Sequence, residues 1–327
     1  MFIKYDILPI GVRPDQTMPN TSSIKFPRFT LFHASNPSSL DIDELTRQWS
    51  FHPEDLQEFL GRAKRTRLEI YPEYLCLATL WPTYRRNSKD IQAAELSFFL
   101  RTDALIILQR GVLPVFSDYL RQLATSSELR STYEQRTPER LLYDILRKLY
   151  QSLFPMIDHL IDDCDHIEQE IFSSHERQMI PHILAIRRNI TDVRKILQVH
   201  KNVLRRLTNH LAESPQYTLQ PSDRYFGELI DLAREDWDTL ENLKERIEAL
   251  QETNESQISF RMADIMKTLT IISVFTFPLT LVASLFSVWQ NKGMPFVNLP
   301  NNFWYVLGVE ALLAAIMFLV FKRKRWF

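Results

Sequence analysis

The chain has 327 residues, a formal net charge of -1 and 24% charged residues, a length that indicates about two domains. This near-neutral balance gives no argument for a nucleic-acid partner, and the six glycines form no nucleotide-binding loop. The two cysteines, Cys76 and Cys164, form no metal-ligand pair in sequence and indicate a reducing compartment. Residues 1–12 are too short and too charged for a cleavable signal peptide.

Residues 1–130 are predicted to form an α/β domain. Segments rich in β-branched and aromatic residues, bounded by turn residues, predict strands within 2–10, 24–34, 67–84, 94–102 and 104–111, with a hairpin turn at 85–90. Helices are expected at 41–49, 52–62 and 115–124. The density of Val, Ile, Leu and Phe is sufficient for a buried sheet covered by helices.

Long helices are predicted from Thr137 onward. Residues 131–221 form a helical pair, with one helix from 137 to about 173 and a second from 176 to 211. A third helix starts near Ser222: its stalk covers 222–268, and residues 223–289 can form one unbroken helix. At about 1.5 Å per residue, this helix is on the order of 100 Å long. Such a length indicates a coiled coil or an oligomeric stalk.

Two apolar segments follow. Residues 269–289 carry no charge, and residues 303–321 are interrupted only by Glu310. As helices they are about 31 and 28 Å long, close to the hydrocarbon thickness of a bilayer. The connecting loop, 290–302, has a single lysine, whereas the tail, 322–327, begins with four basic residues. The positive-inside rule places both chain ends in the cytoplasm. The alternative is a buried helical hairpin in a soluble protein.

The first apolar segment carries a polar stripe with the 3,4 spacing of one helix face. Its members are Thr270, Ser273, Thr280, Ser284 and Ser287, with Phe277 in the remaining position. Hydroxyl groups across a membrane can line water around an axis, but they are also common where membrane helices pack together. The periodicity favours neither interpretation.

The same phase extends backwards into the stalk and carries six carboxylates there. These are Glu252, Glu245, Asp238, Glu235, Asp231 and Glu228. Around a symmetry axis they form acidic rings that concentrate cations. The alternative is a solvated face opposite Leu240, Leu243, Ile247 and Leu250.

Three segments resemble the CorA-type divalent-metal transporters: MADIMKTLTIISVFTFPLTLVASLF, GMPFVNLP and the ending FKRKRWF. The resemblance covers most of the chain and implies an α+β cytoplasmic domain, long helices and two C-terminal transmembrane helices in a funnel-shaped homopentamer. It implies a protein of the bacterial inner membrane that transports divalent cations and is not an enzyme. Mg2+ is the expected substrate, with Zn2+ and Co2+ as further possibilities, and no cofactor is expected.

The resemblance also implies roles for particular residues. Met266 and Leu269 correspond to a hydrophobic constriction, with the polar stripe above them. Glu228 corresponds to a site where family members sense intracellular divalent ions between subunits. Asp231 is a neighbouring candidate for such a site, and Glu252 is expected to face the stalk axis.

The sequence departs from the family pattern at the outer loop. The family has Gly-Met-Asn, whose asparagine receives the hydrated ion, whereas this chain has Gly293, Met294 and Pro295. The substitution leaves two alternatives to Mg2+ transport. One is zinc transport, as in the ZntB branch, and the other is a membrane sensor or scaffold that does not conduct.

One further cluster has metal-ligand chemistry. His159, Asp163 and His166 share one face of an acidic helix, and two imidazoles with a carboxylate can bind zinc. The competing interpretation is a solvated acidic face that attracts divalent ions diffusely. No combination of residues predicts a catalytic site.

Overall fold

The computed structural model describes residues 21–49, 51–61, 65–85, 90–173, 175–217, 225–288 and 302–323. The chain divides into two compact units. The first comprises residues 1–173 and 178–251, and the second comprises residues 174–177 and 252–327.

The first unit contains a six-stranded sheet. Its strands are β1 (Thr21–Lys25), β2 (Thr30–Ser35), β3 (Arg67–Ile70), β4 (Leu75–Arg85), β5 (Asp90–Leu100) and β6 (Ala104–Arg110). They lie in the order β1-β2-β6-β5-β4-β3. β2 and β6 pair in parallel, and every other pair is antiparallel.

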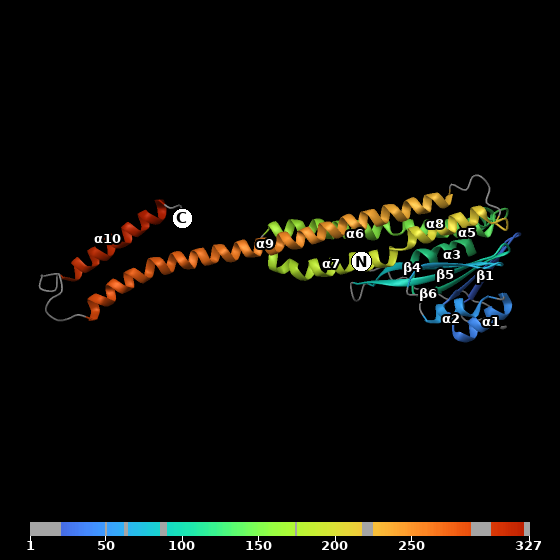
Figure 1. Ribbon diagram of the computed structural model, residues 1–327, viewed down its shortest axis with the longest axis horizontal. Helices are drawn as coiled ribbons and strands as arrows, with labels where there is room; N and C mark the ends of the chain where they lie inside the picture. The colour runs from blue at the N-terminus through green and yellow to red at the C-terminus, as the bar shows by residue number, and fades with distance from the viewer. Residues whose placement is uncertain are drawn as a thin grey trace. The chain divides into compact units, whose positions relative to one another are not determined.

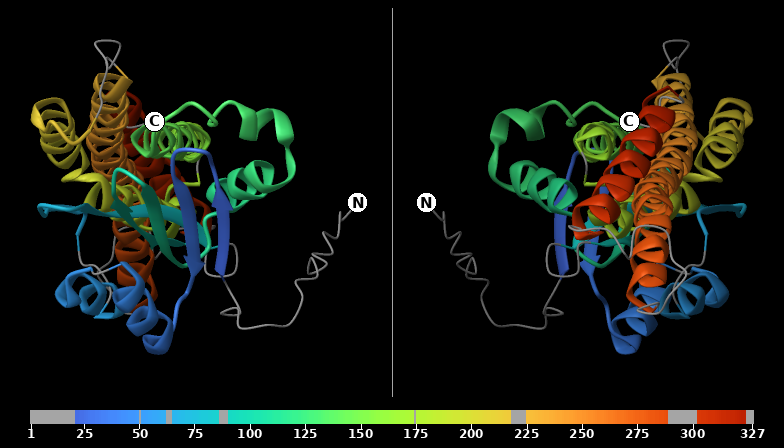
Figure 2. Two further views of the ribbon diagram at one scale, coloured as in Figure 1. Left: turned by 90° about the vertical axis from the view of Figure 1, so that its right-hand side faces the viewer. Right: turned by 90° about the vertical axis from the view of Figure 1, so that its left-hand side faces the viewer.

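Both faces of the sheet are buried. Because alternate residues of a strand point to opposite faces, Leu77 and Ile107 join one core cluster, whereas Cys76 and Ile106 join the other. The second cluster also contains residues of α1 (Ser39–Trp49) and α2 (Pro53–Gly61). The first contains residues of α3 (Pro114–Thr125) and α5 (Pro138–Gln151). Figure 1 and Figure 2 show these two helix pairs on opposite sides of the strands. The predicted α/β character of the N-terminal part of the chain is confirmed.

Two of the predicted strand segments are hairpins. The segment 24–34 turns between Phe26 and Phe29, where the Phe26 N–H donates to the Phe29 carbonyl at 2.9 Å. The segment 67–84 turns in the same way between Tyr71 and Tyr74, also at 2.9 Å. In both cases a proline is the first of the two loop residues, where its fixed φ favours a turn and its missing N–H prevents continued pairing. The expected strand at 2–10 lies outside the described residues.

The predicted long helical pair is four helices rather than two. The four are α5, already described, α6 (Phe154–Phe172), α7 (Glu176–Leu197) and α8 (His200–Glu213). A short helix, α4 (Ser127–Ser131), precedes them. Pro155 separates α5 from α6, because it has no N–H and its ring clashes with the preceding turn. His200 begins α8 and is held in the core by Thr66 at 2.9 Å and Tyr150 at 2.7 Å. These side-chain bonds fix the turn between α7 and α8.

The stalk helix completes the core of the first unit. α9 (Tyr225–Val288) is one helix of 64 residues, as the sequence predicts. Its residues Leu240, Leu243, Ile247 and Leu250 are buried in the same cluster as the isoleucines of α6 and α7. This face has the 3,4 spacing of a helix seam. Arg246 reinforces it by pairing with Asp165 at 2.5 Å and Glu168 at 2.6 Å.

The second unit contains the two apolar segments. The first is the end of α9, and the second lies within α10 (Asn302–Arg323). Both helices are long and apolar enough to cross a membrane, and their most apolar windows contain no buried residue. A helical hairpin in the core of a soluble protein would be mostly buried, so the structure favours the membrane interpretation.

Candidate functional site

The predicted pore-lining residues share one face of α9, in a segment where residues on the other faces are exposed as well. The helix continues through Pro278 without interruption. Met266, Leu269 and Phe277 are 64%, 58% and 71% exposed. The hydroxyl residues of the stripe are also accessible: Thr270, Thr280, Ser284 and Ser287 are exposed, and Ser273 is half-buried. Within one subunit, this face is therefore available to an ion pathway or to other helices.

The threonine hydroxyls of the stripe have a defined orientation. Thr270 Oγ1 donates to the Met266 carbonyl at 2.7 Å, and Thr280 Oγ1 donates to the Thr276 carbonyl at 3.0 Å. Because each hydroxyl hydrogen is used in this bond to the preceding turn, the oxygen offers its lone pairs to other groups. Water molecules bound to a cation direct their hydrogens outward. The stripe therefore presents the acceptors that a hydrated cation needs.

The acidic phase of the stalk lies on the exposed face of α9. Asp231, Glu235, Asp238, Glu245 and Glu252 are all exposed, opposite the buried seam that contains Leu240 and Leu243. These carboxylates would be exposed in a single subunit whether they form a ring around a symmetry axis or a solvated outer face. One subunit does not distinguish these arrangements.

Glu228 differs from the other carboxylates because both of its oxygens are engaged. The Tyr143 hydroxyl donates to Oε2 at 2.6 Å, and Arg147 Nε lies 2.9 Å from Oε1. Burial and the bond to Glu228 raise the pKa of Tyr143. A metal ion at Glu228 would therefore compete with Arg147. In the part of the chain that the structure describes, no group of three or more His, Cys, Asp or Glu side chains is arranged to hold a metal.

That finding also bears on the predicted cluster of His159, Asp163 and His166, which does not form a three-ligand site. His159 and Asp163 instead line a pocket in the first unit. The outer-loop residues Gly293, Met294 and Pro295 lie outside the described residues, so their role stays a prediction.

One chemically unusual residue, Asp236, was not predicted from the sequence. Asp236 is 1% exposed, and neither carboxylate oxygen has a hydrogen-bond partner among the described residues. Burial, followed by the charge of Glu235, raises the pKa of Asp236 to about 7. The signal was available, because Asp236 lies in phase with the buried Leu229, Ala233 and Leu240. A carboxylate at a seam position predicts a buried acid.

An apolar helix with a hydroxyl stripe, a second apolar helix long enough to cross a membrane and a large α/β unit are typical of a membrane transport protein. The chain belongs to the CorA-like Mg2+ transporter protein family, whose sequence model matches residues 28–323. It is similar to the cobalt/magnesium transport protein CorA of Thermotoga maritima, with 24% identity over 283 residues that cover 85% of this chain and 77% of that protein.

Solved structures show the same fold. The complete structure of the CorA magnesium transporter from Methanocaldococcus jannaschii superposes with a TM-score of 0.78 at 18% identity and covers 95% of this chain and 100% of that one. The structure of full-length CmaX superposes with a TM-score of 0.70 at 21% identity, covering 91% of this chain and 89% of that one. The expected fold class and the divalent-cation transporter family are confirmed.

Proposed function

We propose that the protein is a homopentameric channel or carrier for divalent cations, with Mg2+ as the principal substrate. The observation that carries the proposal is the alignment of hydroxyl groups along one face of the exposed, mainly apolar end of α9. A lone helix with this face would expose hydroxyls to lipid, whereas five copies around an axis turn the face toward water. Relatives named as cobalt/magnesium transport proteins support the choice of ion.

In this pentamer the cation passes through the centre with its water shell largely intact. Mg2+ dehydrates reluctantly and keeps several waters, and the oxygens of Thr270 and Thr280 accept hydrogen bonds from that shell. Met266 and Leu269 form an apolar constriction, which can gate by excluding water. No bond is made or broken in this passage, so the proposal includes neither an enzymatic reaction nor a cofactor.

We assign the protein to a bacterial inner membrane, with both chain ends in the cytoplasm. Lys322 and Arg323 end α10, and the positive-inside rule places that end in the cytoplasm. On the same side, the exposed carboxylates of the stalk raise the local cation concentration. Glu228, Asp231 and Glu252 are the proposed regulatory metal ligands.

The selectivity loop is the part of the proposal in which this chain departs from its family. Pro295 stands where the family's Gly-Met-Asn has its asparagine, so this position carries no side-chain amide. Loss of that amide favours a second candidate function, transport of a different divalent ion such as Zn2+ or Co2+.

Flux into proteoliposomes tests both candidates. Purified full-length protein is reconstituted, and uptake of Mg2+, Zn2+ and Co2+ is followed with and without a proton gradient, with protein-free vesicles as the control. Faster Mg2+ uptake supports the principal proposal, and faster Zn2+ or Co2+ uptake supports the second. If no ion enters under any gradient, transport is refuted and a non-conducting sensor or scaffold remains.

A further inference from the structure

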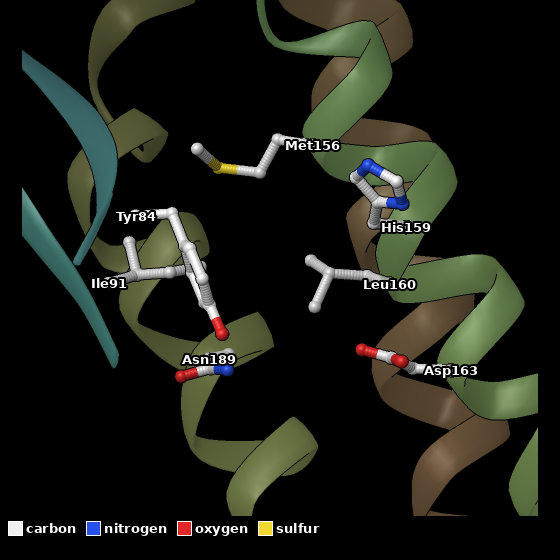
Figure 3. Close-up of a pocket in the computed structure, with 7 residues that line it drawn as sticks. All are labelled: Tyr84, Ile91, Met156, His159, Leu160, Asp163 and Asn189. Carbon is white, nitrogen blue, oxygen red and sulfur yellow. The ribbon is translucent and has the colours of Figure 1, made fainter. Parts of the chain in front are cut away.

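The first unit contains a cavity of about 440 Å3 between the β4–β5 hairpin, α6 and α7. The described residues that line it are Tyr84, Ile91, Met156, His159, Leu160, Asp163 and Asn189. Figure 3 shows Leu160 and Asp163 pointing from α6 toward the side occupied by Tyr84, Ile91 and Asn189. The volume is within the range of small-molecule sites, about 300–1,000 Å3.

The cavity has an apolar interior and a polar opening. Leu160 and Ile91 are only 5% and 6% exposed, and the Met156 side chain adds a flexible apolar wall that can adapt to a ligand. Asp163 and His159 are exposed at the opening, and Tyr84 is 49% exposed. A ligand with an apolar body can therefore bury that body while its polar end remains near solvent.

Three of the polar side chains lie toward one end of the cavity, whereas the fourth, His159, lies nearer Met156. In Figure 3 the Asp163 carboxylate, the Asn189 amide and the Tyr84 hydroxyl occupy the same end, whereas Met156 lies at the other. Asn189 is 7% exposed, so its amide is held inside the protein rather than in solvent. Carboxylate, amide and phenol oxygens all accept hydrogen bonds. This end therefore suits a group that carries several N–H donors.

The charges specify the ligand further. Asp163 is the acidic member of the described lining, and Asp158 and Asp162 on α6 are exposed nearby in sequence. The described lining contains no Lys or Arg. The same lining offers only one imidazole and one carboxylate, too few for a closed zinc site. An organic ammonium satisfies the acceptors and the negative charge, and it does so without metal coordination.

We propose that this cavity binds a small organic ammonium ion with an apolar body, its ammonium group at Asp163 and Asn189 and its body against Leu160, Ile91 and Met156. The site lies wholly within the first unit and shares no residue with the proposed ion pathway. It is therefore independent of whether the protein transports Mg2+ or another ion.

Calorimetric titration of the full-length protein in detergent tests the proposal. The probes are 4-phenylbutylammonium, 4-phenylbutanol and 4-phenylbutanoate, which share one apolar body and differ in charge. We expect saturable binding of the ammonium, at least tenfold weaker binding of the alcohol and none of the carboxylate. Asp163→Asn should weaken ammonium binding at least tenfold, whereas the matched control Asp162→Asn should leave it unchanged. Leu160→Trp should fill the cavity and abolish ammonium binding.

Three outcomes would overturn the proposal. One is the absence of saturable ammonium binding, and another is equal affinity for the ammonium and the alcohol. The third is stoichiometric Zn2+ binding by a protein that does not bind the ammonium. If that Zn2+ binding is lost in both His159→Ala and Asp163→Asn, the cavity is a metal site. Circular dichroism of each variant establishes that it is folded, so that a lost signal reports on binding.

Discussion

Arg261 Nε lies 2.7 Å from the Glu176 carboxylate in the second unit. The Glu176 side chain is 6% exposed, whereas that of Arg261 is 49% exposed. The pair joins the beginning of α7 to α9 a little more than two turns before Leu269, the first residue of the predicted membrane span. The part of α9 that precedes the predicted membrane span is therefore held by a buried carboxylate.

Arg261→Gln should destabilise this junction. The substitution leaves the Glu176 carboxylate buried without its cation, at a cost of about 1–3 kcal/mol. Hydrogen exchange followed by mass spectrometry should show faster exchange at the start of α7. The matched control is Arg177→Gln, because Arg177 is exposed and donates to the Met262 sulfur at 3.9 Å; it should change stability by less than about 0.5 kcal/mol. Equal effects of the two variants would contradict the role of the pair.

Thr280→Leu should reduce ion flux. The substitution removes an outward oxygen acceptor and adds apolar bulk to the stripe face, so a hydrated cation meets a narrower and drier passage. We expect a loss of about tenfold, equivalent to about 1.4 kcal/mol on the barrier, and a similar loss for Ser284→Leu. Val282→Leu adds bulk on the opposite helix face and should retain flux. Unchanged flux in Thr280→Leu and Ser284→Leu would favour helix packing as the role of the stripe.

The success and the limits of prediction along α9 have one physical origin. The 3,4 pattern of Leu240, Leu243 and Ile247 specifies which face is buried, because burial of a helix face depends on its own residues. Whether the opposite face, with Glu245 and Glu252, surrounds an axis depends on other subunits. That information is not contained in the periodicity of one chain, and a single subunit leaves it open as well.

Asp236→Asn should stabilise the protein above neutral pH. Burial raises the pKa of Asp236 to about 7, so between its ordinary pKa and pH 7 the folded state binds a proton that the unfolded state has released. Stability therefore falls as the pH rises through this window, and the cost is complete above it. Asparagine removes the charge, and the gain at pH 8 should be as much as about 4 kcal/mol. At pH 5, which is still above the ordinary pKa of an aspartate, the gain should be smaller, about 1.6 kcal/mol.

Thermal unfolding of the full-length protein at pH 5 and pH 8 measures this difference, with the exposed Asp238→Asn as the control. A variant no more stable than wild type at pH 8 would show that Asp236 is not buried in its charged form.

His200 should produce the opposite pH dependence. Burial lowers the pKa of His200 to about 4, so the unfolded state binds the extra proton between about pH 4 and pH 6.5. Stability is therefore lost as the pH falls through that window. In this pH window the effects of Asp236 and His200 on stability have opposite signs. Both residues interact with Tyr150: His200 is hydrogen-bonded to the Tyr150 hydroxyl at 2.7 Å, and burial, followed by the charge of Asp236, raises the pKa of Tyr150. In Asp236→Asn the His200 effect should emerge, with unfolding temperature rising steeply from pH 4.5 to pH 6.5. A flat profile in that variant would contradict the assignment.

Arg147→Gln should strengthen regulatory metal binding if Glu228 is a metal ligand. Arg147 occupies one Glu228 oxygen at 2.9 Å, so removing it frees an acceptor and eliminates a competing cation. We expect the Mg2+ concentration that half-protects the protein from proteolysis to fall about threefold to tenfold, equivalent to about 0.7–1.4 kcal/mol. Glu228→Gln should raise that concentration. If Arg147→Gln leaves it unchanged, Glu228 has a structural role in binding Tyr143 and Arg147.

Strand and helix types were predictable, but their breaks depended on single residues. Pro27 and Pro72 each divide a β-rich segment into a hairpin, and Pro155 divides a helix, so local chemistry accounts for these corrections. The division between α7 and α8 has a different cause. It depends on His200 reaching Thr66 and Tyr150, which are distant in sequence, and no local pattern contains such a contact.

The candidate sites show the same limit. The hydroxyl stripe was found from spacing alone, and its Thr270 and Thr280 orientations follow from ordinary helix chemistry. The cavity beside Asp163 was not predictable, because Tyr84, Asp163 and Asn189 come together only through the packing of the hairpin against two helices.

The burial of α9 residues in the first core also has a consequence for biosynthesis. Leu229, Leu240 and Leu250 belong to the cluster that includes the sheet, so that core is incomplete until the stalk has left the ribosome. Only 18 residues separate Leu250 from Leu269. At about 5–20 residues per second, translation crosses this interval in about 1–4 s. The first unit is therefore expected to finish folding while the first apolar segment is already being synthesised.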